Sequence, residues 1–89
     1  MTDHLLSSHA TTGHPPSTRF GPVIRHLRDS RGWSQEHLAG LANLNRSYMG
    51  EIERSAAMPS LATAEKLAHA LGVPLSELIS HCERTALDA

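Results

Sequence analysis

The chain has 89 residues, a length that suits one small domain with a single hydrophobic core. Eight lysines and arginines against nine aspartates and glutamates give a formal charge of −1, so the overall basic charge of many nucleic-acid-binding proteins is missing. No apolar run approaches the ~20 residues that span a bilayer, and no basic segment followed by an apolar stretch predicts a secretory signal.

Residues 1–18 contain Gly13, Pro15 and Pro16 and show no sustained helical or strand period. We predict a disordered N-terminal arm over this range. Helix starts, helix stops and apolar residues at 3.6-residue spacing then repeat over residues 19–80, and no stretch alternates as a strand. The sequence therefore predicts an all-α domain over 19–80. Residues 81–89 form either a short C-terminal tail or an extension of the last helix.

The first two predicted helices are marked by start and stop residues. The first begins near Gly21 and Pro22, because proline is tolerated in the first turn of a helix, and it ends at Gly32. The second begins after the N-cap residue Ser34 and ends at Asn43, which tolerates the left-handed conformation of a tight turn. The apolar residues expected to face the core are Phe20, Ile24, Leu27, Leu38, Ala39 and Ala42.

A third helix is predicted over residues 45–54, with Asn45 as its N-cap. Leu44 before the cap and Met49 inside the helix have the spacing of a hydrophobic staple, which fixes the angle at which the chain enters the helix. Met49 shares one face with Ile52, and this face is expected to pack on the core. The residues on another face are Ser47, Gly50, Glu51 and Arg54.

Two further helices follow. Ser60 is predicted to cap a fourth helix that ends at Gly72, and a fifth, short helix starts around Pro74. The inward-facing residues of the fourth helix are expected to be Leu61, Ala64, Leu67, Ala68 and Leu71. In the fifth helix the residues Leu75, Leu78 and Ile79 either close the core or form a dimer surface.

Two short helices joined by "ANLN", the second of them capped and stapled, make a helix-turn-helix. The runs "IRHLRDSRGWSQEHLAGLA", "NRSYMGEIER" and "PSLATAEKLAHALGVPLSEL" resemble, in order and spacing, the Cro/phage-repressor (XRE) family of DNA-binding domains. The resemblance implies a five-helix, lambda-repressor-like fold that places helix 45–54 in the major groove of double-stranded DNA.

The resemblance also implies roles for individual residues. Arg28 and Glu53 match a family pair that forms a buried ion pair, and Gln35 matches a position that binds a phosphate. The residues at positions that face base edges are Arg46, Ser47, Gly50 and Glu51. Helix N-termini after Ser34 and Asn45 offer backbone N–H groups to phosphate without a lysine. The candidate phosphate contacts are Ser34, Gln35, Asn45, Tyr48 and Arg54.

This region departs from the family pattern at two turns, and the role of one of its residues stays open. The family usually has glycine where this chain has Asn43 and Ser55, so the second turn is expected to be more strained or differently shaped. The carboxylate of Glu51 either accepts a hydrogen bond from the amino group of cytosine or forms a solvated pair with Arg54 three residues later.

The expected function is that of a sequence-specific transcriptional regulator, acting as a homodimer on a palindromic operator. The dimer candidates are Leu75, Leu78 and Ile79. The alternative is a protein-interaction module on the same fold, such as a partner-binding antitoxin-like or adaptor protein. The operator, the regulated genes and the choice between repression and activation stay open, and no small-molecule effector is evident.

Other function classes find no support in the sequence. No glycine-rich phosphate loop, activated nucleophile or paired acid and base predicts an enzyme, and no cofactor is expected. The seven histidines and Cys82 show no recognised metal-ligand spacing, so no metal site is predicted. A single cysteine cannot form an internal disulfide, and we expect a cytoplasmic protein.

Overall fold

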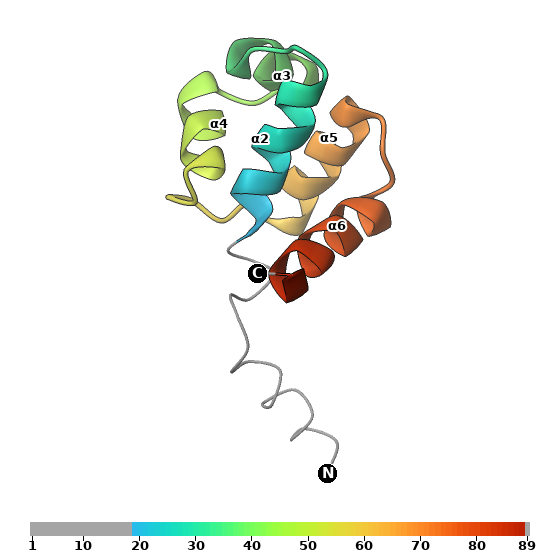
Figure 1. Cartoon of the computed structure of the whole chain (residues 1–89). Coiled ribbons are helices and arrows are strands. Elements are labelled where there is room, and N and C mark those ends of the chain that lie inside the picture. Colours follow the sequence, from blue (N-terminus) through green and yellow to red (C-terminus); the bar gives the residue numbers. More distant parts are fainter. Residues whose placement is uncertain (1–18, 89) are drawn as a thin grey trace.

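The computed structural model describes residues 19–88, with side chains for residues 19–84, so the arm predicted over 1–18 lies outside the described residues. The described part of the chain folds into five helices and no strand, which confirms the all-α prediction (Figure 1). The helices are α2 (Phe20–Ser30), α3 (Gln35–Ala42), α4 (Arg46–Glu53), α5 (Leu61–Leu71) and α6 (Leu75–Asp88). Helix α2 runs through the middle, with α4 on one side of it and α5 and α6 on the other (Figure 1).

Three helix starts lie where the sequence predicts them. The hydroxyl oxygen of Ser34 accepts a hydrogen bond from the backbone N–H of His37, and that of Ser60 accepts one from Thr63. The side chain of Asn45 accepts from two backbone N–H groups at the start of α4. Each cap satisfies donors that a helix leaves unpaired in its first turn, and this fixes where the helix begins.

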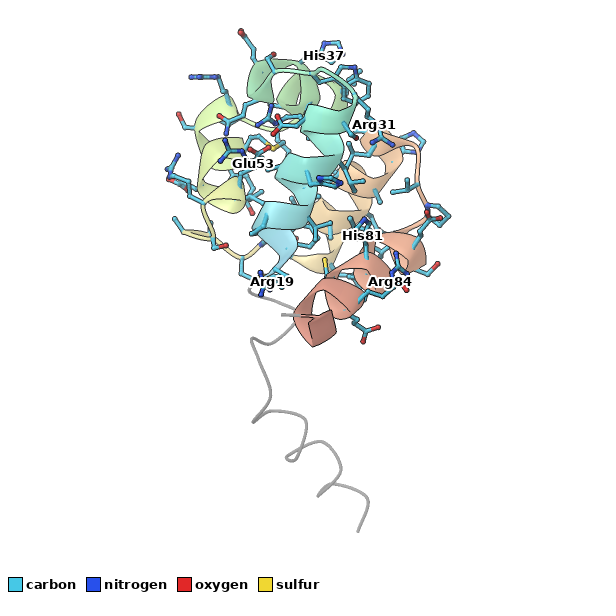
Figure 2. The ribbon with its side chains drawn as sticks, viewed as in Figure 1. Arg19, Arg31, His37, Glu53, His81 and Arg84 are labelled. Atoms are coloured by element: carbon cyan, nitrogen blue, oxygen red, sulfur yellow. The ribbon has the colours of Figure 1, made fainter. Side chains whose placement is uncertain are left out.

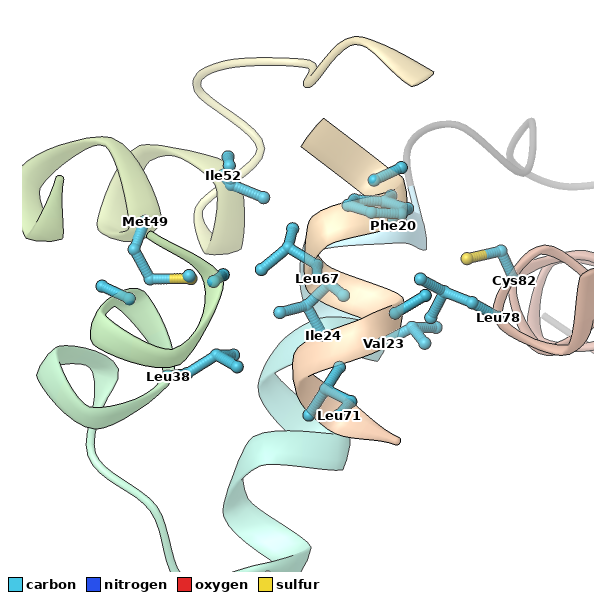
Figure 3. Packing of buried hydrophobic residues seen from close by; sticks show 14 residues of the cluster. Phe20, Val23, Ile24, Leu38, Met49, Ile52, Leu67, Leu71, Leu78 and Cys82 are labelled. Carbon is cyan, nitrogen blue, oxygen red and sulfur yellow. The ribbon is translucent and has the colours of Figure 1, made fainter. Parts of the chain in front are cut away.

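The core is a single cluster to which all five helices contribute (Figure 3). The largest fully buried side chains are Ile24, Leu38, Met49, Ile52, Leu67 and Leu78. The prediction was wrong for Leu61, which is 69% exposed instead of facing inward. Leu61 is the first residue of α5, and side chains in a helix lean toward its N-terminus, so this one points past the end of the core.

Helix α6 is longer than the short helix predicted after Pro74, and of the two alternatives for residues 81–89 the structure shows the extension of this helix, as far as Asp88. It continues through residues 81–88, and Cys82 is buried in the core, so the packed domain extends beyond residue 80. Burial raises the pKa of the Cys82 thiol. Leu78 is 1% exposed and therefore unable to contribute to a dimer surface, which corrects its place among the dimer candidates. Leu75 is half-buried and Ile79 is 39% exposed.

Gly21 sets the distance between α2 and α4. A Cβ at this position would overlap the carbonyl oxygen of Ile52 and lie 2.8 Å from that of Glu53. Only a residue without a side chain lets the two backbones approach this closely. The C-terminal end of α4 is thereby held against the first turn of α2.

Candidate nucleic-acid interface

The turn between α3 and α4 is fixed by local hydrogen bonds. Asn43 adopts the left-handed conformation with φ of 57°, and the backbone N–H of Leu44 donates to the carbonyl oxygen of Ala39 at 2.8 Å. Asn45 Oδ1 then accepts from the backbone N–H groups of Ser47 at 2.7 Å and Tyr48 at 3.3 Å. The left-handed Asn43, the Asn45 cap and the backbone hydrogen bond of Leu44 therefore set the direction of α4 relative to α3.

A buried ion pair anchors the far end of α4. Arg28 Nε donates to Glu53 Oε2 at 2.7 Å, and Arg28 Nη2 donates to Glu53 Oε1 at 2.9 Å. The two side chains are only 10% and 2% exposed, and Glu53 points from α4 toward α2 in Figure 2. The hydrogen bonds with Glu53 raise the pKa of the Arg28 guanidinium, although burial opposes the shift. This is the pair that the family resemblance implies, and a two-pronged contact of this kind sets orientation as well as distance.

Gln35 extends the ion pair to α3, which sequence reasoning did not foresee. Its Nε2 donates to Glu53 Oε1 at 3.0 Å, so one amide hydrogen is used inside the protein. An amide carries two such hydrogens, and the second remains for the phosphate role that the resemblance implies. A signal for this contact was present in the sequence, because a buried carboxylate has more lone pairs than one arginine fills. Three helices are thus joined through one carboxylate.

The outward face of α4 carries three exposed side chains, those of Arg46, Ser47 and Glu51, and the exposed C-cap residue Arg54 follows directly after the helix. All four belong to the residues that the sequence assigns to DNA contacts. Tyr48, a candidate phosphate contact, is half-buried and packs against the core.

Gly50 is buried, so its assignment as a base contact needs correction. A Cβ built on Gly50 would lie 3.0 Å from Arg54 Nη1 and 3.6 Å from Gln35 Oε1. Both side chains therefore cover the position in this structure. Periodicity places Gly50 on the same side of the helix as Ser47 and Arg54, but it does not reveal that a longer side chain folds over it.

The candidate phosphate contacts Ser34 and Asn45 lie at the N-terminal ends of α3 and α4, and both are exposed. Each side-chain oxygen caps its own helix, which leaves other backbone N–H groups of the first turn directed outward. Helix N-termini carry partial positive charge and bind phosphate groups in many proteins. The arrangement offers donors to an anion with few cationic side chains.

The described residues contain neither a metal-binding cluster nor a membrane-spanning helix. Residues 19–84 hold no group of three or more histidine, cysteine, aspartate or glutamate side chains placed to bind a metal ion. None of the helices between residues 20 and 88 has the length and apolar character needed to cross a membrane.

Comparison with known proteins settles the family. A family model described as "Helix-turn-helix" matches residues 24–78, which is more than half of the chain. The chain belongs to the XRE helix-turn-helix family. The matched residues include α3 and α4, the two helices that the sequence predicts as the helix-turn-helix.

Relatives of this XRE-family chain include repressors and controller proteins. The immunity repressor protein of Bacillus phage phi105 is 44% identical over 59 residues, covering 66% of this chain and 41% of that protein. The restriction-modification controller protein C.AhdI from Aeromonas hydrophila has a TM-score of 0.66 and 46% identity, covering 68% of this chain and 92% of that one. SinR, a master regulator for biofilm formation solved in complex with DNA, has a TM-score of 0.63 and 33% identity, covering 67% of this chain and 97% of that one.

The length of the matched region varies among these relatives. In three curated relatives the matched segment makes up 33%, 41% and 53% of the relative's own length. This chain therefore spans a third to about half of those proteins, whereas it spans nearly all of C.AhdI and SinR as solved.

Proposed function

We propose that this chain is a sequence-specific, DNA-binding transcriptional regulator that places α4 in the major groove of double-stranded DNA. The observation that carries the proposal is the contrast between the two faces of α4. Met49, Ile52 and Glu53 fix one face to the rest of the domain, while Arg46 and Glu51 are exposed on the other. Relatives named as repressors and regulators, one of them solved in complex with DNA, support the same function.

The dimensions and chemistry of α4 suit this role. Its eight residues make a helix about 12 Å long, and the major groove is about 12 Å wide. Arg46 in the first turn carries a guanidinium that can donate two parallel hydrogen bonds to guanine O6 and N7. Ser47 beside it can donate or accept. Backbone N–H groups at the starts of α3 and α4 donate to flanking phosphates.

The regulator acts as a homodimer on an operator with two-fold symmetry. A domain with a net charge of −1 neutralises few phosphates, so one copy alone binds weakly and two linked copies are needed for useful affinity. Dimers of helix-turn-helix domains bind half-sites about 34 Å apart. Leu75 and Ile79 on α6 are the remaining candidates for the dimer surface. We place the protein in the cytoplasm, where the DNA of bacteria and their phages lies.

A selection from fragmented genomic DNA tests the proposal. The protein is incubated with the fragments, bound DNA is sequenced, and the recovered site is titrated at two salt concentrations. We expect one palindromic motif to be enriched and its affinity to fall steeply as salt rises, because phosphate contacts release counterions. Failure to enrich any motif, together with no salt-dependent binding, would contradict DNA binding and favour a protein-interaction module.

Arg46→Ala gives a residue-level form of this test. The substitution removes a bidentate base contact, and we expect it to weaken binding to the selected operator by about 1–3 kcal/mol in the same titration. Arg84→Ala is the matched control, because Arg84 is an exposed arginine on α6, on the other side of α2 from α4 (Figure 2). Equal affinities of the two variants would remove Arg46 from the interface.

A further inference from the structure

The carboxylate of Glu51 is presented on the outward face of α4. Glu51 lies near the middle of this helix, its side chain is exposed, and Ser47 is exposed one turn earlier on the same side. A negative charge at this place is unfavourable beside DNA phosphates unless a donor on the DNA compensates it. The position of Glu51 therefore calls for a specific partner.

The structure argues against Arg54 as that partner. Arg54 follows Glu51 at i+3, a spacing at which ion pairs form on helix surfaces. Among residues 19–84, however, the ion pairs join Arg25 and Arg28 to carboxylates and do not include Glu51. The guanidinium of Arg54 lies over Gly50 instead, with Nη1 3.0 Å and Cζ 3.9 Å from the place where a Cβ of residue 50 would stand.

The missing side chain of Gly50 explains this arrangement. Positions 50 and 51 point about 100° apart around a helix, so an arginine that folds over Gly50 is directed away from the carboxylate of Glu51. Gln35 Oε1 lies 3.6 Å from the Cβ position of residue 50, so it faces the same space beside Gly50 as the Arg54 guanidinium. Gly50 thus leaves room for Arg54, and within the part of the chain whose side chains are described Glu51 has no ion-pair partner.

The major-groove edges of the bases differ in what they offer a carboxylate. Cytosine presents an amino donor alone, adenine presents an amino donor next to the acceptor N7, and guanine and thymine present acceptor atoms that repel an anion. An ionised carboxyl group accepts hydrogen bonds and donates none. Cytosine is therefore the base that an unpaired glutamate favours.

We propose that Glu51 selects cytosine at one position of each operator half-site, and that Gly50 and Arg54 keep its carboxylate free to do so. This inference rests on the proposed function. It assigns α4 a mixed code in which Arg46 reads guanine and Glu51 reads cytosine. The carboxylate contributes mainly by excluding the other bases.

The test compares DNA selections by the wild-type protein and Glu51→Gln, each as the full chain. Glutamine pairs in bidentate fashion with adenine, so we expect the favoured base at one position of each half-site to change from cytosine to adenine. In titrations, replacing that cytosine should weaken wild-type binding by about 5- to 140-fold. Glu51→Ala should bind all four bases at that position with similar affinity.

The control removes the same charge elsewhere. Glu65 is exposed on α5, and Glu65→Gln is expected to select the wild-type motif. Thermal unfolding should be alike for all variants because both glutamates are exposed. If Glu51→Gln selects the same motif as the wild-type protein, with no change of base, the inference is overturned and the proposed function stays intact. Absence of any motif for the wild-type protein would instead contradict the proposed function itself.

Discussion

At the scale of single residues, the two glutamates of α4 have opposite roles. Glu53 accepts hydrogen bonds from Arg28 and Gln35 and is almost fully buried, whereas Glu51 is exposed. The sequence could predict this division, because Glu53 shares a face with Met49 and an inward carboxylate needs a cation. It could not predict the covered state of Gly50, which depends on the conformation of the long Arg54 side chain.

Arg28→Ala tests the role of the buried pair. The substitution leaves the Glu53 carboxylate buried without its cation, so we expect the free energy of unfolding to fall by about 3–5 kcal/mol, as measured by urea denaturation. Arg25→Ala is the control, since the 3.7 Å pair of Arg25 with Asp29 is exposed and contributes at most about 1 kcal/mol. If Arg28→Ala lowers the free energy of unfolding by less than Arg25→Ala does, the buried pair does not hold α4 in place.

At the scale of elements, four helices end in the same hydrogen-bonded motif. In each, a residue with positive φ follows the helix, and the next backbone N–H donates to a carbonyl oxygen five residues earlier. The residues with positive φ are Gly32, Asn43, Ser55 and Gly72. The sequence predicted three of these ends, because glycine and asparagine are the usual residues there. Ser55 gives no such signal, and only the family comparison marked it as a departure.

Ser55→Gly should therefore stabilise the protein. Ser55 has φ of 62°, a conformation that costs residues with a Cβ about 1 kcal/mol and that glycine adopts freely. We expect the free energy of unfolding to rise by about 1 kcal/mol in urea denaturation. The reverse change Gly72→Ser, at φ of 75° with open space around it, should lower stability by a similar amount. A less stable Ser55→Gly variant would mean that the serine side chain stabilises the turn.

The last helix shows where sequence patterns stop being informative. Leu75 and Leu78 are apolar residues at helical spacing, but residues 80–84 contribute only Cys82 to the core. One small buried side chain among polar residues is too weak a signal to decide between a C-terminal tail and a longer helix. The contacts of α6 with α2 and α5, which no local pattern contains, are what hold this part of the chain.

At the scale of the whole molecule, the core and the buried ion pair serve one geometric purpose. Helix α2 contacts α4, α5 and α6, and α3 contacts α4 and α5, so α4 is fixed from two directions (Figure 1). The glycine contact at Gly21 and the carboxylate of Glu53 lie at the same end of α4. The domain therefore presents the outward face of α4 as a rigid surface, which reduces the cost of ordering when it binds DNA.

The central claim is that α4 reads DNA from the major groove in two symmetric half-sites. Methylation interference on the selected operator tests this most directly, because methylation of guanine N7 blocks the major-groove edge that Arg46 is proposed to contact. We predict two clusters of guanines whose methylation weakens binding, with their centres one helical turn (~34 Å) apart. Methylation of the same guanines should no longer affect the binding of the Arg46→Ala variant. Binding unaffected by guanine N7 methylation, or affected only by methylation of adenine N3 in the minor groove, would contradict the account.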